Sequence, residues 1–232
     1  MRGKLHPLLD EALEAHGGHD HWRNFKGIAS TILTGGRLWE LKGTPLTPVP
    51  RTRVTPFGEP DWTMTWTPEH VEITAGDGSI IAERDNGREA FDRSFNGRWD
   101  PLNLAYFNGY AMWTYHATPF VFGEPGYEAR EIAPIENEGQ TLRGVAVLFP
   151  ESVHSHTREQ RFYFGSDGLL RRQDYTVDVW ADTPAAHFTS DYVDVDGLKY
   201  PTRRSVFTIK SDGTLARDFN AVTIDLSDYA LF

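Results

Sequence analysis

Histidine, arginine, tyrosine and aspartate recur at every second position in three C-terminal segments, residues 153–164, 169–180 and 186–195. This alternation is typical of β-strands, in which residues two apart share a face. The same faces carry valine and phenylalanine, so the polar groups would be buried among apolar ones. An unpaired buried polar group costs about 1–3 kcal/mol, and we therefore expect a pocket. The candidates, including one residue of the strand that follows, are His154, His156, Arg171, Tyr175, His187, Asp191 and Arg204.

The chemistry available to this set is acid–base catalysis without a cofactor. Histidine titrates near neutral pH, and arginine or tyrosine can hold a developing oxyanion. We therefore assign catalytic roles to His154, His156, Tyr175, His187 and Asp191. The reaction classes that fit are proton transfer, elimination, cyclisation and isomerisation, as in lyases and isomerases. The sequence contains no phosphate-binding loop, dinucleotide fingerprint or nucleophile elbow, so we expect no cofactor.

Two other interpretations of these residues stay open. In the first, they are structural: arginine and aspartate form ion pairs, and the histidines bond to the backbone. In the second, His154 and His156 bind a metal, because residues two apart on a strand point the same way and His187 or a carboxylate could complete the site. A single His-x-His motif is weak evidence, and we assign no metal ligand.

Aromatic residues in two other segments are candidates for binding the ligand. Residues 61–67 alternate and place their two tryptophans on one side, whereas 101–117 carries aromatic residues at helical spacing. The alternative interpretation is packing in the core, which is the common role of such residues. The predicted substrate-binding residues are Arg171, Arg204, Trp62, Trp66, Tyr106, Tyr110 and Trp113.

Two turns decide which of these side chains share a face. An even-numbered loop across residues 165–168 keeps Arg171 on the face of the two histidines. Asp196 and Gly197 form a favourable two-residue hairpin turn, which sets His187 opposite Val206. An odd-numbered loop at the first turn would move Arg171 to the other face.

The remaining pattern predicts a mainly β protein of the α+β class. Residues 8–15 form an amphipathic helix, whereas 28–33 and 37–41 read as two strands of a hairpin turning at the glycines between them. We expect one domain over residues 1–232: N-terminal strands in 26–100, a helical insertion at 101–117 and C-terminal strands in 131–230. The predicted architecture is a large curved antiparallel sheet, an open half-barrel with an N-terminal helix and the helical insertion plugging its mouth.

Composition limits the partners of the protein. The net charge of −10 argues against binding to nucleic acid or an anionic membrane. Cysteine is absent, which excludes disulfides and thiolate ligands. No apolar run approaches the roughly 18 residues of a membrane span, and the first residues have no apolar signal core. We therefore expect a cytoplasmic protein with a hydrophobic small molecule as its partner; the oligomeric state does not follow from the sequence.

Three segments carry a resemblance to a known superfamily. They are Glu11–Gly18 with the following Trp22 and the strand up to Gly36, then Arg161–Arg172, and Asp191–Arg203. Together they resemble the LolA-like proteins, the lipoprotein-localisation-factor superfamily. The resemblance implies an open half-barrel around a hydrophobic cavity plugged by helices, and it implies no catalytic residues. Because no signal peptide or lipobox cysteine is seen, we place the chain in a cytoplasmic small-molecule-binding branch.

The sequence thus supports three functional hypotheses. The first is a cofactor-independent enzyme that holds a hydrophobic, aromatic small molecule and uses a histidine as acid or base. The alternative is a non-catalytic carrier of lipids or other hydrophobic molecules. The third is a metal-dependent enzyme built on the His-x-His motif. A polar pocket that contains histidines favours the enzyme, and a uniformly apolar pocket favours the carrier.

Overall fold

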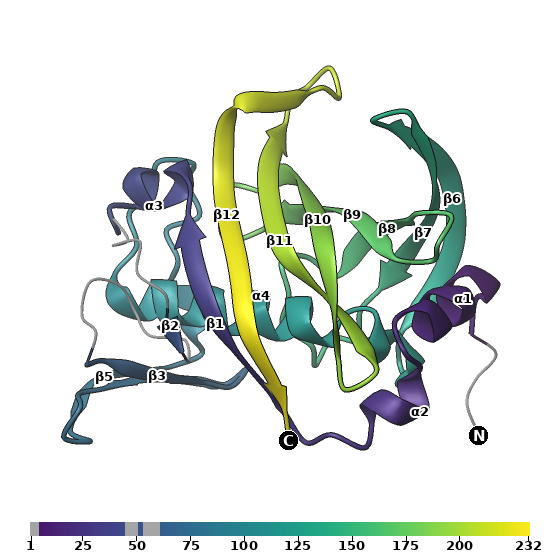
Figure 1. The fold of residues 1–232 in the computed structure, drawn as a ribbon. Helices are drawn as coiled ribbons and strands as arrows, with labels where there is room; N and C mark the ends of the chain where they lie inside the picture. Colours follow the sequence, from purple (N-terminus) through teal and green to yellow (C-terminus); the bar gives the residue numbers. More distant parts are fainter. Residues whose placement is uncertain (1–4, 45–50, 53–60) are drawn as a thin grey trace.

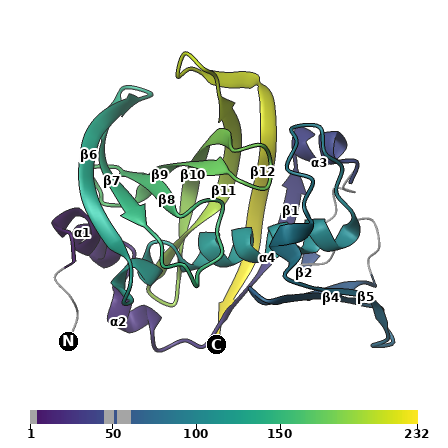
Figure 2. The same ribbon diagram turned by 180° about the vertical axis from the view of Figure 1, so that it is seen from behind.

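A computed structural model describes residues 5–44, 51–52 and 61–232 of the chain. Within these residues, nine antiparallel strands form a large sheet in the order β2-β1-β12-β11-β10-β9-β8-β7-β6, and three more form a small sheet in the order β3-β4-β5. The large sheet bends around a long helix, α4, and its two edges do not pair with each other (Figures 1 and 2). The predicted fold class, a mainly β α+β protein with an open curved sheet, is confirmed.

The strands of the large sheet are β1 (Ile28–Gly35), β2 (Arg51–Thr52), β6 (Glu128–Asn137), β7 (Gln140–Leu148), β8 (Glu159–Phe164), β9 (Leu170–Val177), β10 (Thr183–Val195), β11 (Leu198–Ile209) and β12 (Leu215–Leu231). The small sheet contains β3 (Thr63–Trp66), β4 (His70–Thr74) and β5 (Ile80–Asp85). The helices are α1 (Pro7–Ala15), α2 (His19–Trp22), α3 (Arg37–Lys42) and α4 (Pro101–Ala117), with short 3₁₀ turns η1 (Gly87–Ala90) and η2 (Phe120–Gly123). None of the helices in this described part is long and apolar enough to cross a membrane.

Helix α4 occupies the range predicted for the central insertion. It begins with a reciprocal cap, in which the Asp100 carboxylate accepts from the Asn103 amide at 2.8 Å and the Asn103 side chain accepts from the Asp100 amide at 3.2 Å. The helix is apolar on nearly all sides because it lies between the two sheets. Its Tyr115 packs against His187 of the large sheet, and its Tyr106 packs against Trp66 of the small sheet.

The β10–β11 hairpin has the predicted register. Val195 lies opposite Leu198 across the two-residue turn, and His187 lies opposite Val206. His187 and Arg204 therefore share the face of the sheet that covers α4. The position of these two side chains on one face follows from the geometry of the two-residue turn.

Residues 37–41 are helical and not a strand, so the predicted hairpin at Gly35 and Gly36 is wrong. Gly36 has a φ of +111°, and a Cβ atom there would lie 2.4 Å from the Ala221 carbonyl oxygen. The chain turns away from β12 at this point and enters α3, which ends at Gly43 in the left-handed conformation. Gly35 and Gly36 therefore form the junction between β1 and α3.

Two predictions about the face of the sheet also need correction. The strand expected at 153–164 begins only at Glu159, so His154 and His156 lie in an irregular segment before β8. In the β8–β9 hairpin, the predicted even-numbered loop would set Phe162 opposite Arg171, whereas Phe162 pairs with Gln173, and after a register shift Phe164 pairs with Leu170. This irregularity moves Arg171 off the inner face.

Candidate functional site

Five predicted residues meet at α4 in a hydrogen-bonded cluster, which we call the buried network. They are His156, Tyr175, His187, Arg204 and Tyr110, and Tyr115 of the helix joins them. The Tyr115 hydroxyl lies 2.8 Å from His156 Nε2 and 3.2 Å from the Tyr175 hydroxyl. The Tyr110 hydroxyl lies 3.3 Å from His156 Nδ1. Both ring nitrogens of His156 thus face tyrosines, and neither is free to bind a metal with His154.

Arg204 is a buried cation in this network. Its side chain is 4% exposed and packs over the Tyr115 ring, with its guanidinium carbon 4.9 Å from the ring centroid. It donates to the Tyr115 carbonyl oxygen at 2.8 Å and approaches His187 Nε2 at 3.5 Å. Among the described residues it pairs with no carboxylate, and the buried atoms Arg204 Nε and His187 Nδ1 have no hydrogen-bond partner.

Burial depresses the basicity of both histidines in the network. Desolvation, followed by the charge of Arg88, lowers the pKa of His156 to about 3. Desolvation, followed by the charges of Arg204 and His156, lowers the pKa of His187 well below its ordinary value. Both imidazoles are neutral at physiological pH and are weak bases, and this argues for a structural role.

His154 lies at the outer end of the network. Its Nδ1 bonds to the Tyr106 hydroxyl. Beside it, Arg88 donates to the Asp178 carboxylate at 2.7 Å and to the Ser155 carbonyl oxygen at 2.5 Å. Arg88 and Asp178 were not predicted, because neither shares a strand pattern with the histidines.

Arg171 and Asp191 lie outside the buried network. The register shift lets Arg171 form an ion pair with Asp167 of the β8–β9 turn. Asp191 has a φ of +55°, and its side chain is 58% exposed near Arg203. Asp191 and Arg204 therefore do not line one site as predicted, since strand alternation does not hold through the end of β10.

The predicted aromatic residues divide into two groups. Tyr106 and Tyr110 are fully buried, and Trp62 and Trp66 pack from the small sheet side against the same core. Gly109 allows this packing, because a Cβ atom there would lie 2.2 Å from a ring carbon of Trp66. Trp113 differs, since it is 40% exposed and borders a cavity.

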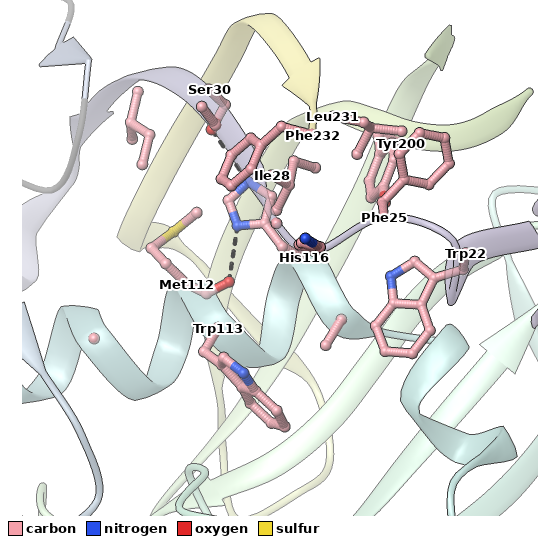
Figure 3. Close-up of a pocket in the computed structure, with 16 residues that line it drawn as sticks. Trp22, Phe25, Ile28, Ser30, Met112, Trp113, His116, Tyr200, Leu231 and Phe232 are labelled. Atoms are coloured by element: carbon pink, nitrogen blue, oxygen red, sulfur yellow. Dashed lines mark hydrogen bonds between the residues drawn. The ribbon is translucent and has the colours of Figure 1, made fainter. Parts of the chain in front are cut away.

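That cavity, which we call the α4 pocket, lies between the C-terminal half of α4, the start of β1 and the end of β12 (Figure 3). Its volume is about 590 Å³, within the range of small-molecule sites. Most of its wall is apolar or aromatic. The lining residues are Trp22, Phe25, Lys26, Gly27, Ile28, Ala29, Ser30, Ile32, Gly109, Met112, Trp113, His116, Ala117, Tyr200, Leu231 and Phe232.

A serine and a histidine in this wall are hydrogen-bonded to each other. Ser30 Oγ lies 3.1 Å from His116 Nε2, while His116 Nδ1 lies 2.9 Å from the Met112 carbonyl oxygen (Figure 3). Since a carbonyl only accepts, His116 Nδ1 carries the proton and Nε2 accepts from Ser30. Desolvation, followed by the charge of Arg204, lowers the pKa of His116 to about 4. The Ser30 hydroxyl and both ring nitrogens of His116 therefore have hydrogen-bond partners within the protein.

The sequence predicted little of this pocket. Ser30 lies where the β1–β12 register shifts, an irregularity that local alternation does not reveal. Ser30 and His116 are 86 positions apart. Trp113 is the predicted ligand-binding residue that does line the pocket. The helical spacing of aromatic residues in 101–117 is the sequence pattern that predicts it.

Comparison with known proteins gives similarity at the level of structure. No protein-family profile matches the sequence, and no curated protein matches it. A putative outer membrane lipoprotein-sorting protein domain from Vibrio parahaemolyticus is 10% identical, with a TM-score of 0.45, and the match covers 96% of this chain and 91% of that one. A DUF1329 family protein from Desulfovibrio piger is 13% identical, with a TM-score of 0.44 and coverages of 97% and 91%.

A LolA superfamily protein from Nitrosomonas europaea is 10% identical, with a TM-score of 0.41 and coverages of 95% and 92%. It belongs to the superfamily that the sequence motifs resemble. At such identities a likeness concerns the fold alone and says nothing about ligand or activity.

Proposed function

We propose that this protein binds a hydrophobic small molecule in the α4 pocket and acts as a non-catalytic carrier. The observation that supports this most is the pocket itself, a cavity of about 590 Å³ walled mainly by apolar and aromatic side chains. Burial of apolar ligand surface in such a cavity contributes about 25 cal/mol per Å². Trp113, with its ring at the pocket wall and partly in solvent, suits an apolar ligand that enters past α4.

The carrier is better supported than the cofactor-independent enzyme. His156 and His187 lie outside the residues that line the α4 pocket and are weak bases. The histidine that does line it, His116, already bonds through both ring nitrogens. An enzyme built on this pocket would therefore depend on the other titratable side chains that line it, Lys26 and Tyr200. The assignment to a cytoplasmic branch stays a prediction.

The test is binding of a neutral apolar fluorophore, N-phenyl-naphthylamine, to the purified protein. We expect saturable binding, and we expect Trp113→Ala to weaken it by about tenfold, because one large aromatic wall residue is removed. Trp113 is partly exposed, so its replacement leaves the fold intact. Phe95→Ala is the matched control, since Phe95 is also exposed, at 46%, but is not a lining residue.

Equal losses for the two variants would place the probe elsewhere. Absence of saturable binding by the unmodified protein would contradict the carrier proposal. Turnover of an apolar ester or ketone that depends on His116 would favour the enzyme instead.

A further inference from the structure

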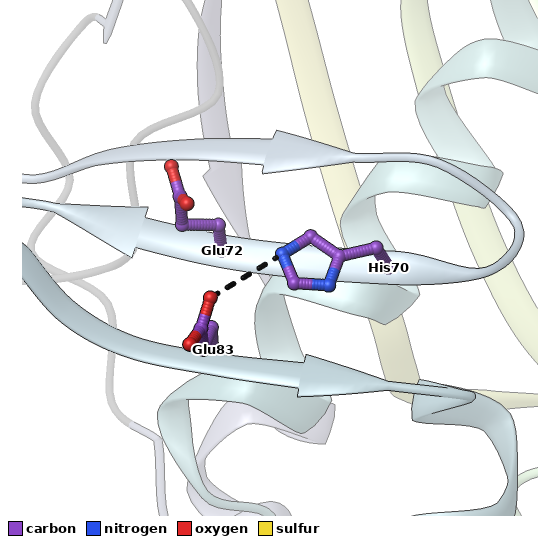
Figure 4. Close-up of side chains that lie close together, drawn as sticks. All are labelled: His70, Glu72 and Glu83. Atoms are coloured by element: carbon purple, nitrogen blue, oxygen red, sulfur yellow. Dashed lines mark ion pairs between the residues drawn. The ribbon is translucent and has the colours of Figure 1, made fainter.

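The solvent-facing side of the small sheet carries a histidine and two glutamates whose ligand atoms converge. His70 and Glu72 are two apart on β4, and Glu83 lies opposite Glu72 on β5. One ligand atom of each residue lies within 4.8 Å of the other two (Figure 4). His70 Nε2 and Glu83 Oε2 are 3.8 Å apart, whereas two tetrahedral bonds of about 2.1 Å hold their ligand atoms roughly 3.4 Å apart. Small side-chain movements would therefore allow all three to bind one ion.

The pairing of Glu72 with Glu83 is unfavourable without a cation. Like charges directly opposite each other in a sheet are destabilising. Among the described residues, neither carboxylate has an arginine or lysine partner, and Glu83 pairs with His70 alone. A bound cation would convert this repulsion into two favourable contacts.

His70 is already oriented as a metal ligand would be. Its Nδ1 lies 2.8 Å from Asp85 Oδ1, the carboxylate of the residue opposite it on β5. In the neutral imidazole, the form that binds a metal, this hydrogen bond keeps the proton on Nδ1 and leaves the Nε2 lone pair on the side of Glu83. Carboxylates bonded to the second nitrogen of a histidine ligand are a regular feature of metal sites.

The backbone beneath the cluster is held firmly. Val71 and Ile73, the residues that alternate with His70 and Glu72, are 0% exposed and pack in the core with α4. The ligand strand cannot turn over without exposing these side chains. Preorganisation of this kind favours a defined coordination geometry.

We propose that His70, Glu72 and Glu83 form a site for a divalent transition-metal cation such as Zn²⁺, with water in the remaining position. One imidazole nitrogen and two carboxylates suit Zn²⁺ or its neighbours, whereas Mg²⁺ and Ca²⁺ prefer oxygen ligands alone. Three protein ligands with one open position are the pattern of an accessible site. The site is on the other side of the small sheet from α4 and does not depend on the proposed carrier function.

The test is Zn²⁺ binding to the full-length protein by isothermal titration calorimetry after removal of metals with a chelator. We expect one Zn²⁺ per chain, and we expect His70→Gln, Glu72→Gln and Glu83→Gln each to weaken binding by at least about tenfold. Asp85→Asn should weaken it about tenfold through loss of histidine orientation. Glu69→Gln is the charge-matched control, because Glu69 is exposed beside the cluster but is not one of its three ligands.

Folding and binding can be separated in this experiment. Because Glu72→Gln relieves repulsion, the metal-free variant should melt no lower than the metal-free parent. Cobalt titration adds a spectroscopic signature, since Co²⁺ bound by nitrogen and oxygen ligands gives visible absorption bands that the glutamine variants should lose. No stoichiometric binding by the parent, or the same loss in Glu69→Gln as in Glu72→Gln, would overturn the proposal.

Discussion

Lowering the pH from about 7.5 to about 5 should destabilise this protein by about 4 kcal/mol or more. Desolvation lowers the pKa of His16 to about 4 and that of His156 to about 3, from an ordinary value of 6.5. Each is therefore neutral in the folded protein over this range, whereas in the unfolded chain it becomes protonated as the pH falls through about 6.5. Each loses about 1.4 kcal/mol of stability per pH unit, about 2 kcal/mol by pH 5.

The sign follows from the direction of the shift. A lowered histidine pKa contributes full stability above the unfolded value of 6.5 and loses it as the pH falls toward 4 for His16 and 3 for His156. His116 and His187 act in the same direction, because burial also lowers the pKa of each. The summed loss of stability from these histidines approaches the total free energy of unfolding of an ordinary domain. We therefore expect acid unfolding well above the pH at which most carboxylates become protonated.

Urea unfolding followed by tryptophan fluorescence over this pH range measures the effect. His156→Gln should reduce the slope of stability against pH by one proton, since glutamine can still bond to the tyrosines but does not titrate. Stability that stays level between about pH 7 and about pH 5 would contradict the prediction, as would an NMR titration of His156 near its ordinary pKa.

Tyr115→Ala should lower the free energy of unfolding by at least about 4 kcal/mol. The Tyr115 side chain is 4% exposed, so truncation leaves a cavity in the core. It also leaves His156 Nε2 without its 2.8 Å partner and removes the ring under the Arg204 guanidinium. A buried polar atom without a partner, and a buried cation that loses its aromatic contact, add to the cost of the cavity.

Tyr115→Phe separates these contributions. It keeps the ring and its contact with Arg204 but removes the hydroxyl between His156 and Tyr175. We expect a loss of about 1–3 kcal/mol, smaller than that of the alanine variant. Chemical denaturation at neutral pH gives both values. Equal losses in the two variants would mean that the hydroxyl accounts for the whole effect, and a negligible loss in Tyr115→Ala would show that the network does not stabilise the fold.

The buried network shows how far strand alternation predicts a site. It correctly placed Tyr175, His187 and Arg204 on one inner face, because turn length and pleat act over a few residues and leave little choice of register. It failed for Arg171 and Asp191, where a register shift and a left-handed residue break the alternation. Such irregularities depend on packing with distant segments, which local sequence does not contain.

Strand alternation also does not predict where a cavity lies. Polar residues on an inner face predict a cavity, yet Tyr110 and Tyr115 of α4 fill that space in the structure. The cavity lies on a different face of the same half of the helix, where β1, β12 and the residues after α2 leave a gap. Whether polar groups meet a ligand or one another depends on which helix side chains reach them.

Local sequence patterns were enough to predict the class of fold, the long central helix and the turn at Asp196 and Gly197, and composition gave the acidic, cysteine-free character of the chain. Periodicity, turn chemistry and composition are local properties, and they act before any tertiary contact forms. Only the packing of distant segments fixes the position of the α4 pocket, the pairing of Ser30 with His116 and the convergence of Glu72 and Glu83. Each of these three features is formed by segments that lie far apart in the sequence and meet only in the folded sheets. Their positions depend on the many contacts between those segments, which no local pattern contains.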